Sequence, residues 1–336
     1  MAVPHSAFEA FDFDALHGAI TDLRGKQVFF IGGAPKSGTT WLRLLLNAHP
    51  GISCGGEGHF PNRLVPALAR ALKAYNVSID AKNKTIFGQL EAQPLFSNRH
   101  ALYLAGAAIS LLLGRPAKAG TARIVGDKTP DNVRFLPLLA GLFPAARFIH
   151  IVRDPRDCAV SAWFHNLRVN PARVPGRFPS FEAFALNFAH IWAATARGGV
   201  KFAEQRPERC LTLRYEDLSD DPVRSLDRIC AFLGASREPL VLEACRDATE
   251  FSRLSGGRAR GDEDRGSFFR NGMAGDWRNH FDTATERDFC AKAGAVMALF
   301  RYGPNDPGAS VEDGQRLSPV AAQEQGFLES PLGKPI

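Results

Sequence analysis

The sequence predicts an α/β fold of three layers, in which a central parallel sheet is flanked by helices in a P-loop nucleotide-binding-like arrangement. Apolar runs alternate with stretches of helical periodicity, as they do when each strand is followed by a crossover helix. The run at 147–152 is nearly continuous, which is typical of a parallel strand buried on both faces. A shorter run at 29–31 leads into a glycine-bracketed turn and a helical pattern, and such sheets bind phosphate at that point.

The individual elements follow from local patterns. We expect strands at 27–31, 123–125, 147–152 and 209–213, and helices at 39–48, after Pro130, from Pro155, and at 181–196, 222–233 and 286–300. Thr129 is the candidate N-cap of the helix that begins at Pro130, and Pro137 is a candidate kink within it. Gly234 is expected to end the helix at 222–233. The Gly-, Arg- and Asp-rich stretch 255–272 is expected to be a loop.

The 336 residues suffice for one large α/β domain or two small ones. Because the candidate site segments extend from residue 33 to residue 277, one domain must bring them together. We therefore expect an N-terminal arm at 1–26 with a short amphipathic helix, a single domain at 27–303, and a flexible tail at 304–336. Within the domain, we interpret the helix-rich stretch 61–120 as an insertion that lies over the active site.

The formal net charge of +6 is mildly basic, and a site for a polyanionic nucleotide accounts for part of it. No block of lysine and arginine resembles a nucleic-acid-binding arm, so no nucleic-acid partner is expected. The six cysteines form no C-x-x-C pair and have no histidine at metal-binding spacing. We expect reduced thiols, a cytoplasmic protein and no metal site. The N-terminus lacks an apolar signal region, and the apolar stretch 101–114 is too short to span a bilayer, so no integral membrane segment is expected.

The turn after the first strand has the spacing of a phosphate-binding P-loop, with Gly33 and Gly38 separated by four residues. Nucleotide triphosphatases carry a lysine and then a serine or threonine directly after the second glycine. Thr39 and Thr40 occupy those positions, and the lysine, Lys36, comes three residues earlier. This displacement argues against hydrolysis of ATP or GTP and favours another phosphate-bearing nucleotide.

Two further segments carry candidate anion-binding groups. Arg153 ends a buried strand and Ser161 follows eight residues later, so the two can clamp a second phosphate. The alternative is a surface Arg–Asp pair with a serine that faces its own helix. In the loop around 268–277, two aromatics precede Arg270 and Gly272, and the glycine permits close approach of backbone to a ligand. The alternative here is a packed surface loop.

Three motifs in order along the chain resemble those of sulfotransferases that use 3′-phosphoadenosine 5′-phosphosulfate (PAPS). The segment 35–41 resembles that family's 5′-phosphosulfate loop, and Arg153 with Ser161 resembles its 3′-phosphate clamp. The segment 269–277 is similar to its C-terminal R-K-G-x-x-G-D-W signature. One departure is that Asn271 stands where the family usually has lysine, which removes a cation from the 3′-phosphate pocket.

The resemblance implies a set of cofactor-binding residues. Backbone and hydroxyl groups of Ser37, Gly38, Thr39 and Thr40 would hold the 5′-phosphate. Lys36 would contact the bridging oxygen, and Trp41 and Tyr215 would contact the adenine. Arg153, Ser161, Arg270 and Gly272 would hold the 3′-phosphate, and Pro35, Phe269 and Asn271 belong to the same matched motifs.

The catalytic base is less clearly marked. Cytosolic small-molecule members use a histidine in a K-T-H segment, but the similar segment here is Lys128-Thr129-Pro130. Carbohydrate and tyrosyl-protein members use a glutamate shortly after the first helix, and Glu57 matches it. We therefore expect Glu57 to be the general base, with His59 as the alternative. Lys128 would help to orient the acceptor or the sulfuryl group.

The resemblance thus implies a PAPS-dependent O-sulfotransferase that releases adenosine 3′,5′-bisphosphate (PAP) and needs no metal. The acceptor would be a small molecule or a carbohydrate that carries a hydroxyl group, namely a carbohydrate, lipid or small-metabolite alcohol or phenol. Two alternatives remain open: a P-loop kinase or phosphohydrolase, and a catalytically silent nucleotide-binding protein of the same fold. The oligomeric state does not follow from the sequence.

Overall fold

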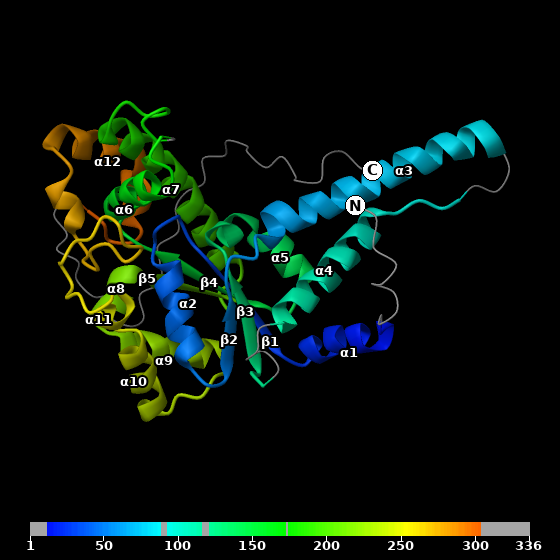
Figure 1. Ribbon diagram of the computed structural model, residues 1–336, viewed down its shortest axis with the longest axis horizontal. Helices are drawn as coiled ribbons and strands as arrows, with labels where there is room; N and C mark the ends of the chain where they lie inside the picture. Colours follow the sequence, from blue (N-terminus) through cyan, green and yellow to red (C-terminus); the bar gives the residue numbers. More distant parts are fainter. Residues whose placement is uncertain (1–11, 89–92, 116–120, 173, 304–336) are drawn as a thin grey trace.

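The computed structural model describes residues 12–88, 93–115, 121–172 and 174–303 (Figure 1). Its core is a five-stranded parallel sheet with the strand order β2-β3-β1-β4-β5. The strands are β1 (Gln27–Gly32), β2 (Ile52–Gly55), β3 (Ile124–Lys128), β4 (Arg147–Val152) and β5 (Cys210–Arg214). The predicted α/β class, with a central parallel sheet flanked by helices, is confirmed.

Helices cover both faces of this sheet (Figure 1). They are α1 (Phe13–Arg24), α2 (Thr39–Ala48), α3 (Val65–Lys82), α4 (Asn98–Gly114), α5 (Leu136–Leu142), α6 (Pro155–Val169), α7 (Phe181–Gln205), α8 (Tyr215–Asp220), α9 (Pro222–Leu233), α10 (Pro239–Ala248), α11 (Phe251–Leu254) and α12 (Thr283–Ala298). Within the described ranges, no helix is both long enough and apolar enough to cross a bilayer.

The alternation of side chains along β1 explains the three layers. Phe29 and Ile31 pack with α2, α9 and α10, whereas Val28 and Phe30 pack with α4 and α5. Successive residues of a strand point to opposite faces, so a strand with apolar side chains on both faces needs a helical layer on each side. A further apolar cluster joins α6, α7 and α12 beyond the end of β4.

The order of the strands positions the site. The chain runs from the central strand β1 to β2 and β3 on one side and then to β4 and β5 on the other. Parallel sheets bind ligands at the carboxyl ends of the strands where the strand order reverses. Here that point lies between β1 and β4. The loop from β1 to α2 and the residue that follows β4 therefore meet at one edge of the sheet.

Some predicted elements differ in detail. The Thr129 hydroxyl does not cap a helix but donates to Asp127 Oδ2 at 2.8 Å. A 3₁₀ turn follows at Pro130–Phe135, and Pro137 lies in the first turn of α5 instead of kinking a longer helix. Strand β2 was not predicted, because four residues with one serine and one glycine are too few to show a strand pattern.

The N-terminal helix packs on the domain, since α1 lies against α4 and buries Leu23. The described part of the predicted insertion 61–120 is helical, but α3 runs away from the sheet and α4 returns along it (Figure 1). None of its described residues lines the main cavity. The described part of the insertion thus contributes nothing to the cavity wall, and its position over the active site stays a prediction. The predicted tail at 304–336 falls outside the described residues.

Close packing between β1 and β3 gives a stability prediction. A Cβ at Gly126 would lie 2.6 Å from the carbonyl oxygen of Phe29, whereas a Cβ at Gly294 in α12 would meet no atom within 4 Å. We expect Gly126→Ala to lower the free energy of unfolding by about 1–3 kcal/mol through overpacking. The matched variant Gly294→Ala is expected to raise it by about 0.5–1 kcal/mol, because glycine costs conformational entropy in a helix. Urea unfolding measures both, and changes of the same sign would contradict the proposed packing.

Candidate active site

The loop between β1 and α2 leaves no room for a side chain at either of its two glycines, Gly33 and Gly38. A Cβ at Gly33 would lie 2.3 Å from the carbonyl oxygen of Ile151 on β4, and one at Gly38 would lie 2.4 Å from the ring of Tyr215. Lys36 and Gly38 have φ angles of 70° and 90°, in the left-handed region. These turns lead into the first turn of α2, whose N–H groups have no partner inside the helix. The loop therefore has the geometry of an anion-binding nest.

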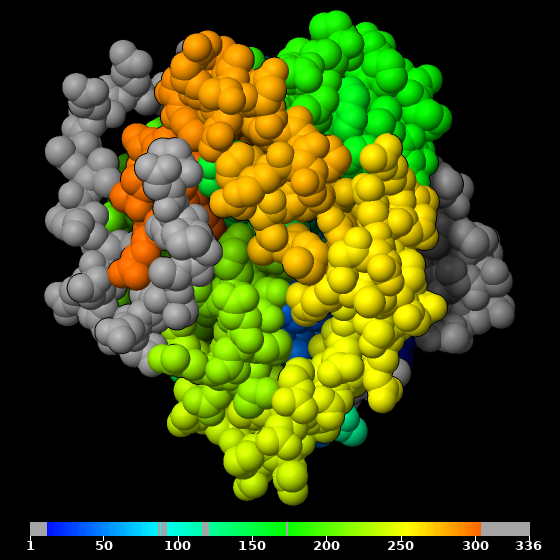
Figure 2. All heavy atoms as spheres, turned by 90° about the vertical axis from the view of Figure 1, so that its left-hand side faces the viewer, coloured from blue at the N-terminus to red at the C-terminus, as the bar shows by residue number. Residues whose placement is uncertain are grey.

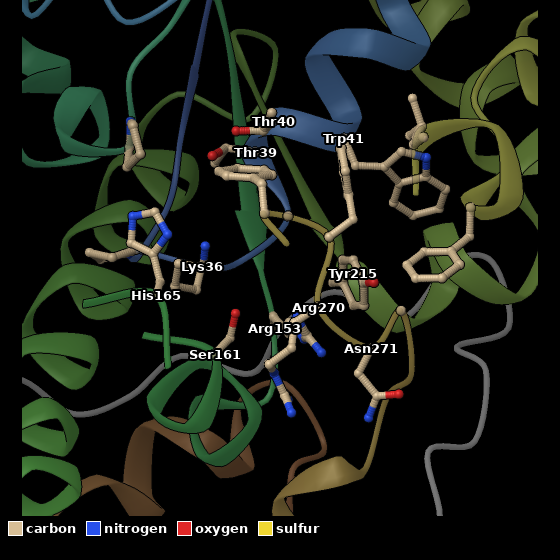
Figure 3. A pocket seen from close by; sticks show the side chains of 18 of the residues that line it. Lys36, Thr39, Thr40, Trp41, Arg153, Ser161, His165, Tyr215, Arg270 and Asn271 are labelled. Atoms are coloured by element: carbon tan, nitrogen blue, oxygen red, sulfur yellow. The ribbon is translucent and has the colours of Figure 1, made fainter. Parts of the chain in front are cut away.

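A cavity of about 380 Å³ opens in front of this loop. Figure 2 shows it as a hollow with blue atoms of the N-terminal part at its base, bounded by the yellow-green and the yellow-to-orange segments. In Figure 3, Lys36 and His165 lie at one side of the pocket, and Trp41, Tyr215 and Asn271 lie at the other. Segments from six parts of the chain thus meet in one volume, as a single domain requires.

Thirteen of the fourteen predicted cofactor-binding residues line this cavity. They are Pro35, Lys36, Gly38, Thr39, Thr40, Trp41, Arg153, Ser161, Tyr215, Phe269, Arg270, Asn271 and Gly272. Ser37 is the exception: it is fully buried, and its Oγ lies 3.7 Å from Cys158 Sγ. The backbone N–H of Ser37 donates to the carbonyl of Ala34. The expectation that the Ser37 hydroxyl faces the ligand is therefore corrected, because that side chain points into the core.

Lys36 reaches the cavity without an acidic partner. Its ammonium lies 4.6 Å from the centre of the Phe268 ring, and no described carboxylate forms an ion pair with it. Burial, together with the nearby charges of Arg153 and Arg168, lowers the pKa of Lys36 to about 8. A bound anion would restore the preference for the charged form.

Arg153 follows β4 and meets Ser161 of α6 at the same cavity. Its guanidinium lies 4.2 Å from the centre of the Tyr215 ring and donates to the carbonyl of Met273 at 3.0 Å. Asp157 Oδ2 lies 3.7 Å away, and the buried Nε of Arg153 has no partner among the described residues. The side chain is only 12% exposed. The pair of Arg153 and Asp157 is therefore largely buried, which argues against the alternative of a surface Arg–Asp pair.

The loop that carries Arg270 is held from several sides. The guanidinium of Arg270 pairs with Glu263 and Asp276, and Arg258 donates to the carbonyls of Phe269 and Arg270 at 2.6 and 2.9 Å. Asn271 Oδ1 is buried and has no partner among the described residues. A bound ligand with a hydrogen-bond donor, or a water molecule, would satisfy that oxygen.

The predicted catalytic residues gather at the other side of the loop. Lys128 Nζ lies 2.6 Å from Glu57 Oε1 and 3.2 Å from the hydroxyl oxygen of Thr40. His59 Nε2 lies 3.4 Å from the second carboxylate oxygen of Glu57. Glu57 and His59 line the cavity, whereas Lys128 is buried behind them and does not. One carboxylate thus bridges a buried ammonium and an imidazole beside the first turn of α2.

Two residues that also line the cavity, His165 and Arg260, were not predicted from the sequence. His165 lies one helical turn after Ser161, and that spacing on α6 was the available signal. Because Arg168 can only donate, its contact of 3.2 Å with His165 Nδ1 leaves the ring proton on Nε2. Burial lowers the pKa of His165 to about 4, aided by the charges of Lys36 and Arg168. Arg260 lies in the predicted loop 255–272, where nothing marked it.

Comparison with known proteins places the chain in a family. Residues 28–239 match the model of the sulfotransferase family. The chain belongs to this family. Protein-tyrosine sulfotransferase 2 of Gallus gallus is 29% identical over 220 residues, which cover 64% of this chain and 53% of the relative. Sulfotransferase 2A1 of Homo sapiens is 28% identical over 155 residues, which cover 43% of this chain and 54% of the relative. This sulfotransferase-family chain thus spans about half the length of these curated relatives.

A solved structure has the same fold as this family member. Mouse sulfotransferase SULT7A1, solved in complex with PAP, matches with a TM-score of 0.52 at 22% identity, over 89% of this chain and 93% of the mouse chain. The P-loop-like sulfotransferase fold predicted from the sequence is thereby confirmed. Among the described residues, no group of three or more His, Cys, Asp or Glu side chains is arranged to hold a metal ion.

The lowered pKa of Lys36, about 8, predicts a pH dependence of anion binding. The ammonium form attracts an anion and the neutral amine does not. The affinity for PAP should therefore be highest below about pH 8 and should fall above it, by at most about tenfold per pH unit. Calorimetric titration between pH 7 and 9.5 measures this, because nucleotide phosphates are already ionised there. Lys36→Arg stays charged and should flatten the profile; equal slopes for both proteins would contradict this role.

Proposed function

We propose that the protein transfers a sulfuryl group from PAPS to a hydroxyl group of an acceptor, which yields a sulfate ester and PAP. The observation that carries the proposal is the cavity with anion-binding groups at both ends. The loop with Lys36 forms one end, and Arg153 with Ser161 forms the other. Family membership supports the reaction class, and the mouse protein of the same fold was solved with PAP.

The aromatic residues between the two ends suit a nucleoside. The rings of Trp41 and Tyr215 meet edge to face, with centres 5.8 Å apart, and both line the cavity. Trp41 Nε1 donates to the carbonyl of Thr249 at 3.1 Å, which fixes the orientation of the indole. An adenine in contact with Trp41 would connect a 5′-phosphosulfate at the loop with a 3′-phosphate near Arg153.

The mechanism follows from the positions of the charged groups. The acceptor oxygen attacks the sulfur in line with the departing phosphate, so the new S–O bond forms as the bond to the bridging oxygen breaks. Negative charge then develops on that bridging oxygen, where Lys36 and the N–H groups at the start of α2 stabilise it without reorganisation. Glu57 accepts the proton of the acceptor hydroxyl. Lys128 and His59 hold its carboxylate beside Thr40.

The acceptor in this proposal is a carbohydrate, lipid or small-metabolite alcohol or phenol. Besides the predicted cofactor-binding residues, the cavity is lined by Glu57, His59, His165 and Phe268. An aromatic ring among hydrogen-bonding groups suits a molecule that carries both a hydroxyl and an apolar part. We also propose that the protein works in the cytoplasm without a metal ion; all six of its cysteines are unpaired.

A nucleotide panel tests this function against a P-loop kinase or phosphohydrolase. PAP at 100 times its dissociation constant should stabilise the fold by about 2.7 kcal/mol. ATP at the same concentration should stabilise it much less, because it lacks a 3′-phosphate and no lysine follows Gly38. Thermal unfolding with each nucleotide measures the difference. Equal shifts would remove the case for PAPS.

Glu57 and His59 can be separated by substitution. We expect Glu57→Gln to lower kcat by about 10²–10⁴, the usual contribution of a general base, while PAP still binds. His59→Gln should lower kcat less, because His59 acts only through the Glu57 carboxylate. Sulfate transfer from PAPS to a panel of hydroxyl acceptors measures turnover, and PAP binding controls for folding. A larger loss in His59→Gln would identify the imidazole as the base, and unchanged turnover in both variants would contradict a base at either residue. No turnover in the wild-type protein, with PAP still bound, would favour a catalytically silent protein.

A further inference from the structure

The cations that line the cavity differ in how their charge is compensated. Arg153 lies beside Asp157, and Arg270 pairs with Glu263 and Asp276. Arg260 has no carboxylate partner among the described residues. It donates to Ser219 Oγ at 2.7 Å and to the carbonyl of Gly272 at 3.2 Å, and both of these partners are neutral. Within the described part of the cavity lining, Arg260 and Lys36 are therefore the cations whose charge is not neutralised locally.

These two cations belong to different ends of the cavity. Lys36 lies beside Phe268, whereas the guanidinium of Arg260 lies 5.8 Å from the centre of the Trp41 ring. Figure 3 shows Lys36 and Trp41 on opposite sides of the pocket. A ligand that is anionic at one end only would leave one of these charges without a counter-ion. The distribution thus suits a ligand with a separate anionic group at each end.

Arg260 is also directly connected to the Arg153 end. Arg260 bonds the carbonyl of Gly272 and Arg153 bonds the next carbonyl, that of Met273. Arg153 lies over Tyr215 as Arg260 lies over Trp41, and the two rings touch edge to face. The guanidinium groups of Arg153 and Arg260 therefore border the same wall of the cavity. The charge of Arg153 is largely compensated by Asp157, whereas that of Arg260 is compensated by no described carboxylate.

We propose that Arg260 is a nucleotide-binding residue that attracts the 3′-phosphate of PAPS and PAP. This inference rests on the proposed function and deepens it. Because Arg153 and Arg270 are already paired with carboxylates, Arg260 supplies the excess positive charge at this end. It compensates for the neutral Asn271, whose side chain lines the same wall. The arginine comes from a separate segment of the loop, twelve residues before Gly272 along the chain.

The test compares PAP with adenosine 5′-monophosphate, which lacks the 3′-phosphate. Arg260→Ala should weaken PAP binding about tenfold, as expected for the loss of one charge-assisted hydrogen bond at an exposed site. Binding of the monophosphate should change less than about twofold. Arg260→Lys should recover most of the PAP affinity because it keeps the charge. In turnover assays, the loss should fall on the KM for PAPS more than on kcat.

Arg253→Ala is the matched control. Arg253 is an exposed arginine on the neighbouring helix α11 that does not line the cavity, so its removal changes the net charge equally. It should leave both affinities unchanged. Equal weakening of PAP and the monophosphate in Arg260→Ala would assign Arg260 to another part of the nucleotide, and no weakening of either would remove it from the site; each overturns the inference. If the wild-type protein itself fails to prefer PAP, the proposed function fails instead.

Discussion

The site depends on the absence of side chains at Gly33 and Gly38, the two glycines of the loop that follows β1. Gly33 lies against the carbonyl of Ile151 and Gly38 against the ring of Tyr215, so any larger residue would push the loop away from the sheet. In this close position, the loop and the start of α2 line the same cavity as Arg153. The two glycines therefore allow the close approach that sets the course of the loop and, with it, the shape of the cavity.

The distribution of charge determines what this cavity attracts. Of the four Lys and Arg side chains among the described lining residues, Arg153 and Arg270 lie beside carboxylates, and the pairs of Arg270 fix the loop that carries it. The exceptions, Lys36 and Arg260, leave a positive charge at each end. Desolvation and the nearby arginines lower the pKa of Lys36 to about 8, so the charged amine is disfavoured in the free protein, and a bound anion offsets this. A dianionic nucleoside ligand matches this arrangement better than a single phosphate does.

The group around Glu57 links β2 and β3 to the first turn of α2. Lys128 comes from β3 and Glu57 follows β2, two adjacent parallel strands whose carboxyl ends lie side by side. The ammonium of Lys128 bonds both Glu57 and the hydroxyl of Thr40 in the first turn of α2. The carboxylate is thereby positioned relative to the phosphate loop by one buried cation. This arrangement fixes the position of the proposed base.

The sequence alone determined the fold class, the order of most elements and the anion-binding loop, because these depend on local periodicity and on glycine spacing. It also indicated that Arg153, Ser161 and the 269–272 segment belong to one site. The tertiary structure decided what depends on contacts between distant segments. It showed that Ser37 turns into the core, that β2 joins the sheet, that α3 extends away from the site, and that Arg260 reaches the cavity. No local sequence pattern predicts these features, because each depends on which distant segments come into contact once the sheet has formed.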